Sequence, residues 1–357
     1  IKKNKKHSYN ICATNMHLLD SFGKSKKEIT KDGFKISDSI YMTLDGYNHT
    51  TTTKSMGVLI QSFSDIVDRL KPDWVIIAGD RNESLAACLV SSYSYIPTAH
   101  IQAGELSGNI DGLARHAIGK FAHIHFSSNK DSTKRLIKLG EQRFRIKQVG
   151  APQLDDIKNK RFKNKMEVFK KFNLNSGEEY VLVIFHPVTE ELKNIDLQVL
   201  ELINSLNKIP EKKIWILPNS DSGSSIIKDI IFRKITNSIH TYDNVSREYF
   251  LGLMNNCKFL IGNSSSGILE APSFKIPVIN IGSRQNGRLQ SLNILNVKIV
   301  TEKNITTKIK QAISIKFLKK IQKTINLYGN GNSSKKIIET IESTKINDYL
   351  LTKKLTY

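Results

Sequence analysis

The stretch YVLVIFH, residues 180–186, decides the class of fold. Its side chains are apolar or aromatic from Tyr180 to Phe185, with no alternation between apolar and polar positions. Such a run is typical of a strand buried on both faces, as in a parallel sheet covered by helices on either side. Further short apolar runs lie before and after it, separated by amphipathic helical patterns. The sequence therefore predicts an α/β fold built from βαβ units.

The same pattern extends over most of the chain. We expect strands at 9–14, 73–79, 98–103, 123–128, 144–150, 180–186, 213–219, 258–263 and 276–282. Clear helical periodicity covers 55–71 and 194–208, and the part from about residue 302 is expected to be helical.

A basic segment separates two series of strands. Residues 158–179, KNKRFKNKMEVFKKFNLNSGEE, precede the strand that begins at residue 180. We therefore expect two Rossmann-like, doubly wound domains, at 1–157 and 175–345, with a ligand in the cleft between them. The first domain opens on a charged segment, and its first expected strand is 9–14.

Composition argues against several classes of protein. The 357 residues carry 54 Lys and Arg against 33 Asp and Glu, which gives a net charge of +21. The lysines are spread evenly, without an aromatic-interleaved basic stripe or a zinc finger, so nucleic-acid binding is not expected to be the main role. No stretch is apolar enough to span a bilayer, no signal peptide is recognisable, and the three cysteines form no metal or disulfide pattern. We expect a cytoplasmic protein.

Polar clusters follow five of the expected strands. Ligands of open parallel sheets bind beyond the carboxyl ends of the strands, so these clusters are the candidate site. They are Asp80 with Arg81, residues 102–111, His186, the group Asn219, Asp221 and Ser222, and residues 263–267. The agreement of five strand ends, rather than any single cluster, indicates a ligand site.

The segment GNSSSGILEAPS, residues 262–273, has the pattern of a strand, a hydroxyl-rich loop and the start of a helix. Its backbone N–H groups and Ser264, Ser265 and Ser266 can hold a phosphate at the positive end of the helix. Glu270 can accept hydrogen bonds from ribose hydroxyls. The alternative is a serine N-cap followed by an ordinary surface glutamate. The chain has no Walker GxxxxGK and no complete GxGxxG, which disfavours ATP and NAD loops.

Candidates for proton transfer occupy other strand ends. His186 ends an apolar strand and precedes a proline, where it can contact phosphate or transfer a proton; the alternative is a structural turn histidine. Asp80 and Asp111 can each act as an acid or base, or can cap the helix that follows. Arg115 and His116 lie on the helix after Asp111, and we expect one of them to face the site.

Five motifs together resemble the UDP-N-acetylglucosamine 2-epimerase family, and its hydrolysing branch most closely. They are GDR (79–81), HIQAGELSGNIDGLARHAIGKFAH (100–123), HPVTEE (186–191), LPNSDSGS (217–224) and GNSSSGILEAPSFKIPVINIGSRQNGR (262–288). The match runs in order from about residue 9 to residue 300. The resemblance implies a GT-B-like fold of two Rossmann-like domains, with a nucleotide sugar in the cleft between them.

The resemblance also implies an enzyme and its reaction. UDP is eliminated across C1 and C2 of the sugar to give a glycal, and water then adds to give the 2-epimer. With UDP-N-acetylglucosamine the product is N-acetylmannosamine, for nonulosonate, capsule or surface-glycan synthesis. The reaction needs a base for the C2 proton and a group that stabilises the departing diphosphate. No metal and no other cofactor is implied.

The resemblance assigns roles residue by residue. The catalytic set that it implies is Asp80, Gln102, Glu105, Asp111 and His186. The set that binds substrate and nucleotide is Arg81, Arg115, Asn219, Asp221, Ser264, Ser265, Ser266, Gly267, Glu270 and Arg284. Within this set the serines match the diphosphate loop and Glu270 matches the ribose contact.

Two departures from the family pattern concern function. Many relatives carry a glutamate in place of Gln102, and an amide cannot remove a proton from carbon. Glu105 keeps a carboxylate in the loop, where glutamate is common in the hydrolysing branch. Glutamine at the first position occurs in relatives that act on 2,4-diacetamido-trideoxy sugars, so a UDP-2,4-diacetamido-2,4,6-trideoxyhexose is the alternative substrate. The family's opening strand and arginine loop have no counterpart here, so the first sheet is expected to lack its central strand.

Other functions stay open on this evidence. A GT-B glycosyltransferase shares the fold and the nucleotide loop. A UDP-sugar-binding protein without catalysis fits the change at Gln102 and the missing opening segment. Relatives are often dimers or tetramers, so we expect a homo-oligomer, with neither a nucleic acid nor a membrane as partner.

Overall fold

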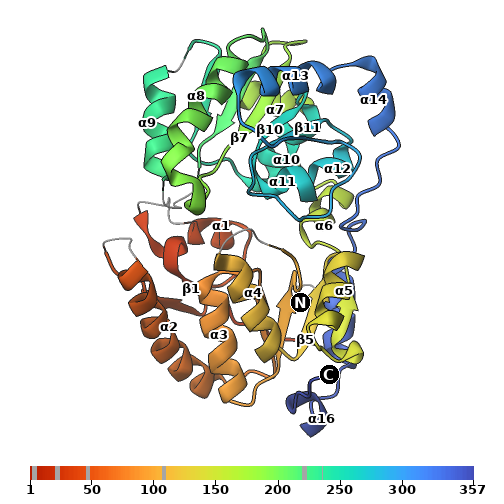
Figure 1. The fold of residues 1–357 in the computed structure, drawn as a ribbon. Coiled ribbons are helices and arrows are strands. Elements are labelled where there is room, and N and C mark those ends of the chain that lie inside the picture. Colours follow the sequence, from red (N-terminus) through yellow and green to blue (C-terminus); the bar gives the residue numbers. More distant parts are fainter. Residues whose placement is uncertain (2–5, 21–24, 46–48, 107–109, 219–222, 235) are drawn as a thin grey trace. The chain divides into compact units, whose positions relative to one another are not determined.

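A computed structural model of the chain describes residues 1, 6–20, 25–45, 49–106, 110–218, 223–234 and 236–357. The chain divides into two compact units (Figure 1). Unit 1 comprises Ile1–Glu105, Ile110–Val149 and Ser334–Tyr357, and unit 2 is built mainly from Gly150–Ser333. Each unit contains parallel strands connected by helices, so the predicted α/β class is confirmed.

Unit 2 holds a six-stranded parallel sheet. Its strands are β7 (Tyr180–Ile184), β8 (Lys212–Ile216), β9 (Ile239–Tyr242), β10 (Leu260–Gly262), β11 (Val278–Ile281) and β12 (Ile294–Val297). Their order across the sheet is β12-β11-β10-β7-β8-β9. The chain therefore starts in the middle, winds to one edge, and returns to wind to the other. This is the doubly wound order, in which ligands bind where the winding reverses, here between β7 and β10.

The two faces of β7 explain its uninterrupted apolar sequence. Val181, Val183 and Phe185 belong to one buried cluster, which contains side chains of α8 (Ile195–Leu206), α9 (Ser224–Lys234) and α13 (Glu302–Ala312). Tyr180, Leu182 and Ile184 belong to a second cluster, with side chains of α7 (Lys165–Lys171) and α10 (Arg247–Asn256). Because helices cover both faces, no position of this strand tolerates a polar side chain.

Unit 1 holds two separate parallel sheets. The strands β1 (Cys12–Thr14) and β2 (Asp38–Ile40) pair with each other. The other sheet contains, in sequence order, β3 (Val75–Ala78), β4 (Thr98–Ile101), β5 (Ile124–Ser127) and β6 (Ile146–Gln148). Within the residues that the structure describes, no strand joins the two sheets. One face of the larger sheet packs against α3 (Asn82–Tyr93) and α4 (Ile110–Phe121).

Every strand expected from the sequence is present, with somewhat shorter bounds, and three further strands were not predicted. The three are β2, β9 and β12, and each lies at an edge of its sheet. An edge strand is buried less completely, so it lacks the continuous apolar run that identifies a central strand. The helix expected from residue 55 begins earlier, as α2 (His49–Leu70).

The remaining elements are short. They are η1 (Asn15–Leu18), α1 (Lys26–Lys31), α5 (Lys130–Lys138), η3 (Arg143–Arg145), α6 (Gln153–Lys158), η4 (Thr189–Asn194), α11 (Ser265–Leu269), α12 (Ala271–Phe274), α14 (Ile315–Ile321), α15 (Ser333–Ser343) and α16 (Asp348–Leu351). The helical character expected after residue 302 is thus confirmed. None of the helices in the described part of the chain combines the length and the apolar character that a membrane crossing requires.

The C-terminal helices α15 and α16 pack on the larger sheet of unit 1. Their residues Ile337 and Leu350 join the buried cluster that contains Phe126 of β5. Arg145, whose side chain is completely buried, donates hydrogen bonds to the carbonyls of Leu350 (2.7 Å) and of Tyr349 and Thr352 (3.1 Å each). The end of the chain is therefore held by a buried guanidinium as well as by apolar packing.

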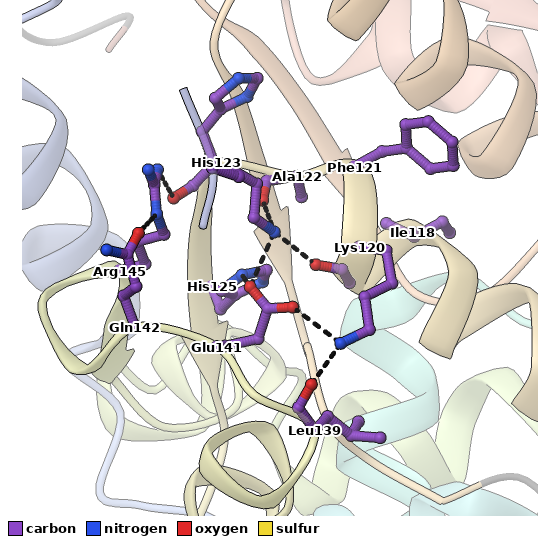
Figure 2. Close-up of polar contacts among 12 residues, drawn as sticks. Ile118, Lys120, Phe121, Ala122, His123, His125, Leu139, Glu141, Gln142 and Arg145 are labelled. Atoms are coloured by element: carbon purple, nitrogen blue, oxygen red, sulfur yellow. Dashed lines mark hydrogen bonds and ion pairs between the residues drawn. The ribbon is translucent and has the colours of Figure 1, made fainter. Parts of the chain in front are cut away.

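A buried charge cluster around Glu141 ties down the same segment. His125 donates to the Glu141 carboxylate from Nε2 (2.9 Å), and the nitrogen Nζ of Lys120 lies 3.6 Å from it (Figure 2). The ammonium of Lys353 lies 2.7 Å from the same carboxylate and also donates to the carbonyls of Gly119, in the last turn of α4, and of Ala122, directly after it. Three acceptors therefore satisfy the three N–H bonds of this ammonium.

The electrostatics of the cluster keep both Glu141 and Lys353 charged at neutral pH. Burial alone raises the pKa of Glu141, but His125 and Lys353 outweigh it and lower that pKa to about 2. Burial lowers the pKa of Lys353 to about 8, against the attraction of Glu141. The pair therefore joins an ammonium on the C-terminal segment to a carboxylate that lies between α5 and β6.

We predict that Lys353→Met lowers the free energy of unfolding by about 3 kcal/mol, because the buried Glu141 carboxylate then loses the nearer and more deeply buried of its two lysine partners. Lys354→Met is the matched control, since the neighbouring Lys354 is exposed, and it should change the free energy by less than about 0.5 kcal/mol. Urea denaturation of the full chain, followed by circular dichroism, measures both. Equal stability of the two variants would show that the Glu141 cluster does not anchor the chain end.

Candidate functional site

The loops after β3 and β4 meet at the side chain of Arg115. Arg115 lies on α4, and only 4% of its side chain is exposed. It forms an ion pair with the carboxylate of Asp80, which follows β3, and donates to the backbone carbonyl of Gln102 after β4 (2.6 Å). One guanidinium therefore fixes both loops at the carboxyl ends of two neighbouring strands. Arg81, not Asp80, occupies the N-cap position of α3, so the interpretation of Asp80 as a helix cap is wrong.

A histidine supports the strand end that carries Asp80. The nitrogen Nε2 of His100 lies 2.7 Å from the carbonyl oxygen of Gly79. Since a carbonyl can only accept, Nε2 carries the proton. Burial lowers the pKa of His100 to about 3, so the imidazole is neutral at pH 7. This hydrogen bond joins β4 to the turn that presents Asp80.

The carboxylate of Glu105 is fixed in the same loop. Glu105 is 3% exposed, and Ser128, which follows β5, donates to its Oε1 atom (2.5 Å). Arg135 of α5 donates to the carbonyl of Gly104 (2.6 Å). Gly104 has φ +73°, and a Cβ there would lie 2.6 Å from the Ser132 carbonyl, so glycine is required for this close packing. The loop from residue 102 to residue 105 is therefore rigid, with a buried acid at its end.

The structure places the other acid/base candidates of unit 1 only in part. Gln102 adopts a left-handed conformation, with φ +61°, and this conformation directs its carbonyl to Arg115. Asp111 falls in the first turn of α4, but its side chain lies outside the described part of the structure. Arg81 lies next to Asp80, with about half of its side chain exposed and its Nε 3.3 Å from Glu83. Of Arg115 and His116, Arg115 contacts Asp80, and the expectation that one of the two faces a bound ligand stays a prediction.

Unit 2 brings His186 and Asn263 together at the point where the winding reverses. His186 follows β7 and Asn263 follows β10. The Asn263 side chain accepts from the His186 backbone N–H (2.7 Å) and donates to the His186 carbonyl (2.8 Å). The strands approach so closely that a Cβ on Gly262 would lie 1.9 Å from the carbonyl oxygen of Ile184. The sequence pattern included Asn263 in a polar cluster but did not reveal this role.

The serine loop leads directly into α11. The Ser264 side chain accepts from the backbone N–H of Ser266 (3.3 Å), so Ser264 is the N-cap that the sequence offered as an alternative. Ser265 begins the helix, and Gly267 lies within it, packed against Val278 of β11. Capping uses one serine hydroxyl, while the N–H groups of the first turn are the groups that a phosphate would need. A phosphate role for this loop remains a prediction.

Arg284 and its neighbour Gln285 are held against the serine loop. Arg284 donates from Nη1 to the carbonyl of Asn263 (3.3 Å), and the buried Gln285 donates to the same carbonyl from Nε2 (2.8 Å). The GxRQxGR segment, whose arginine the sequence singled out, therefore contacts the end of β10. Asn219 and Asp221, which were predicted to contribute to this site, lie outside the described residues.

Glu270 is buried between α11 and α12 and is paired with an arginine. It is 4% exposed, and its carboxylate forms an ion pair with Arg247 at the start of α10. Burial raises the pKa of Glu270, and the positive charge of Arg247 opposes that rise. The alternative interpretation of Glu270 as an ordinary surface glutamate is therefore wrong. Sequence analysis missed Arg247, because an arginine at a helix start is usually exposed to solvent.

The chemistry available differs between the two units. Unit 1 presents the carboxylates of Asp80 and Glu105 at neighbouring strand ends, and carboxylates in such positions can move protons. Unit 2 presents backbone N–H groups, the serine hydroxyls and Arg284, which suit an anion. Among the residues that the structure describes, no three of His, Cys, Asp or Glu are grouped so that they could hold a metal ion.

Comparison with known proteins yields a consistent set of similarities. The sequence model of the UDP-N-acetylglucosamine 2-epimerase family matches residues 1–342. The chain is 34% identical over 344 residues to a hydrolysing UDP-N,N′-diacetylbacillosamine 2-epimerase of Legionella pneumophila, covering 96% of this chain and 90% of that protein. It is 38% identical over 304 residues to a hydrolysing GDP/UDP-N,N′-diacetylbacillosamine 2-epimerase of Campylobacter jejuni. That alignment covers 84% of this chain and 79% of the Campylobacter protein.

Solved structures share the fold. A crystal structure of UDP-GlcNAc 2-epimerase from Neisseria meningitidis, bound to UDP-GlcNAc, superposes with a TM-score of 0.81. The alignment covers 96% of this chain and 94% of that chain, at 20% sequence identity. At that identity the similarity establishes the fold, and the predicted GT-B-like α/β class, with parallel sheets in each of two units, is confirmed.

We predict that Arg115→Met lowers the free energy of unfolding by about 2 kcal/mol, because the largely buried Asp80 carboxylate then loses its ion pair with Arg115. Replacing Asp80 with asparagine in the same variant should restore part of the lost free energy of unfolding, since it removes the carboxylate charge that Arg115 balanced. Arg81→Met, at the half-exposed neighbouring arginine, is the control, with an expected change of less than about 0.5 kcal/mol. Urea denaturation measures these three variants and Asp80→Asn alone; strictly additive effects of Arg115→Met and Asp80→Asn would rule out the coupling.

Proposed function

The chain belongs to the UDP-N-acetylglucosamine 2-epimerase family, and from that premise we propose that it is a hydrolysing 2-epimerase of a UDP-2-acetamido sugar. UDP-N-acetylglucosamine is the proposed substrate, and N-acetylmannosamine and UDP are the proposed products. The observation that supports this activity most directly is the pair of fixed carboxylates, Asp80 and Glu105, at the ends of neighbouring strands. The name of the family and the substrate bound in the Neisseria meningitidis structure support the choice of sugar.

The proposed reaction has two steps. In the first, a carboxylate removes the proton at C2, the C1–O bond to the diphosphate breaks, and a C1=C2 double bond forms. In the second, water adds its hydroxyl to C1 and a proton returns to C2 from the opposite face, which inverts that centre. Each step moves one proton at C2, so a general acid and a general base are both required.

The carboxylates of unit 1 are proposed to carry out the proton transfers. The C2 proton is weakly acidic, so its removal depends on a base held in a fixed position. Glu105 meets this condition through its hydrogen bond from Ser128, and Asp80 meets it through Arg115. Asp111 is included on the strength of the family resemblance. Gln102 is assigned to the site through its position in the loop, because an amide cannot act as the base.

The residues of unit 2 are proposed to hold the UDP group. Negative charge develops on the diphosphate as the C1–O bond breaks, and oriented N–H groups and cations stabilise it. Ser264, Ser265 and Ser266 with Gly267 supply the loop, and Arg284 and His186 lie at the same strand ends. The buried Glu270 is proposed to accept hydrogen bonds from the ribose. Asn219, Asp221, Arg81 and Arg115 complete the proposed binding set.

A second substrate is supported by a separate observation. The relatives from Legionella pneumophila and Campylobacter jejuni, at 34% and 38% identity, are both named as acting on UDP-N,N′-diacetylbacillosamine. This sugar carries a second acetamido group, at C4. Its UDP derivative is therefore the alternative substrate. Either product would serve the synthesis of nonulosonate sugars for a capsule or other surface glycan, in the cytoplasm and by a homo-oligomeric enzyme.

We predict that the purified chain releases UDP from UDP-N-acetylglucosamine, with N-acetylmannosamine as the second product. Incubation with this sugar nucleotide and with UDP-N,N′-diacetylbacillosamine, side by side, determines which has the higher kcat/KM. Glu105→Gln should reduce kcat at least about a hundredfold, because an amide cannot transfer the proton. Asp68→Asn, at an exposed carboxylate on α2, is the matched control and should retain full activity.

Two outcomes would contradict the proposed reaction, each in favour of a different function, and a third would contradict only the role of Glu105. Release of UDP only when a sugar acceptor is added, without change at C2, identifies a glycosyltransferase. Binding of both sugar nucleotides without any UDP release identifies a binding protein. Full activity of Glu105→Gln would remove Glu105 from the catalytic set while leaving the overall reaction intact.

A further inference from the structure

We propose that Arg247 is a positioning residue that orients Glu270 toward the hydroxyl groups of a ribonucleotide, and so makes unit 2 selective for ribose. The inference rests on the proposed function, since it assumes that Glu270 contacts the ribose of UDP. It goes further in assigning a role to Arg247, Asp156 and α6, none of which belongs to the predicted site.

The guanidinium of Arg247 contacts three acceptors, each through a different nitrogen. Nη1 forms the ion pair with Glu270, Nε lies 3.4 Å from a carboxylate oxygen of Asp156, and Nη2 donates to the carbonyl of Gln153 (2.9 Å). Asp156 and Gln153 both belong to α6. Because the guanidinium is planar, contacts along two of its edges fix its orientation. Helix α6 therefore determines where Nη1 points, and with it the position of Glu270.

Glu270 needs such a partner because it is buried. Its side chain is 5% exposed, and burial raises its pKa by disfavouring the ionised form. The positive charge of Arg247 opposes this effect, whereas the negative charge of Asp156 adds to it. A carboxylate that accepts hydrogen bonds from two hydroxyls has to be ionised, since only then do both oxygens act purely as acceptors. Arg247 supplies both the charge and the orientation.

The place of Glu270 in the chain connects the pair to the nucleotide loop. Glu270 is the C-cap residue of α11, whose N-cap is Ser264 of the serine loop. Helix α11 has five residues, so it spans little more than one turn. A diphosphate at the start of this turn would leave the attached ribose within reach of its end. An ion pair that only stabilises the packing of α6, α10 and α12 could lie anywhere along these helices. The position of Glu270, one helical turn after the serine loop, is the position that a contact with the ribose requires.

Calorimetric binding of UDP and of 2′,3′-dideoxy-UDP to the full chain tests the proposal. The unmodified protein should bind UDP at least about tenfold more tightly, because the dideoxy compound cannot donate to a charged acceptor. Arg247→Gln and Glu270→Gln should each weaken the binding of UDP and leave the binding of 2′,3′-dideoxy-UDP nearly unchanged. The affinity for UDP should then exceed that for the dideoxy compound by about twofold or less. The double variant should show no further loss, since the two residues act through one contact.

A matched control is available at Arg161. Its Nη1 lies 3.8 Å from the same Asp156 carboxylate, but the side chain is 59% exposed, and the Glu270 ion pair is made by Arg247. Arg161→Gln should leave the preference for UDP unchanged. If Arg247→Gln does not fold, Arg247→Lys replaces it, because lysine keeps the charge but lacks the planar fork. We expect Arg247→Lys to reduce the preference at least about threefold.

The outcomes separate this inference from the proposed function. Equal weakening of both ligands by Arg247→Gln, or an unchanged preference in Arg247→Lys, would show a structural role only and overturn the inference. A protein that binds both ligands equally well also overturns it, even if UDP-sugar turnover is intact. A ribose preference that depends on Arg247, in a protein without turnover, supports the inference and contradicts the proposed enzyme. Failure to bind UDP contradicts both.

Discussion

A charge that leaves water needs a partner, and this constraint explains three buried ion pairs of the molecule. Arg115 with Asp80 joins the loops after β3 and β4, and Arg247 with Glu270 joins α10 to the end of α11. Lys353 with Glu141 holds the chain terminus to unit 1. In each case one partner lies on a segment that has little regular structure of its own. The ion pairs thus fix the loops that a parallel sheet leaves at its strand ends.

Much of this organisation could be read from the sequence because parallel sheets leave a simple signal. Strands such as β7 are buried on both faces, and polar residues at their ends mark the edge where ligands bind. The edge strands β2, β9 and β12 lack that signal. The partners of the buried charged residues could not be recognised from the sequence either. Arg247 and Asp156 are 91 residues apart in the sequence, and Arg145 and Leu350, whose carbonyl it contacts, are 205 residues apart. No local spacing in the sequence therefore indicates these pairs.

Gln102 shows where sequence and structure contribute different information. From the sequence, it is an amide in a position where the family resemblance leads us to expect an acid. In the structure, its left-handed backbone directs its carbonyl to Arg115, so the residue shapes the loop through its main chain. The loops after β3 and β4 carry the carboxylates of Asp80 and Glu105, which contact Arg115 and Ser128 respectively. The proton chemistry can therefore be retained without an acid at residue 102.

The central claim is that these carboxylates remove and restore the proton at C2 of a UDP-2-acetamido sugar. The most direct test is to run the reaction in D2O and to examine the released sugar by NMR and mass spectrometry. We expect one solvent deuterium at C2 of every product molecule, with the inverted configuration at that carbon. Release of UDP together with a sugar that retains its original proton and configuration at C2 would contradict it, because C2 would then have taken no part in the reaction.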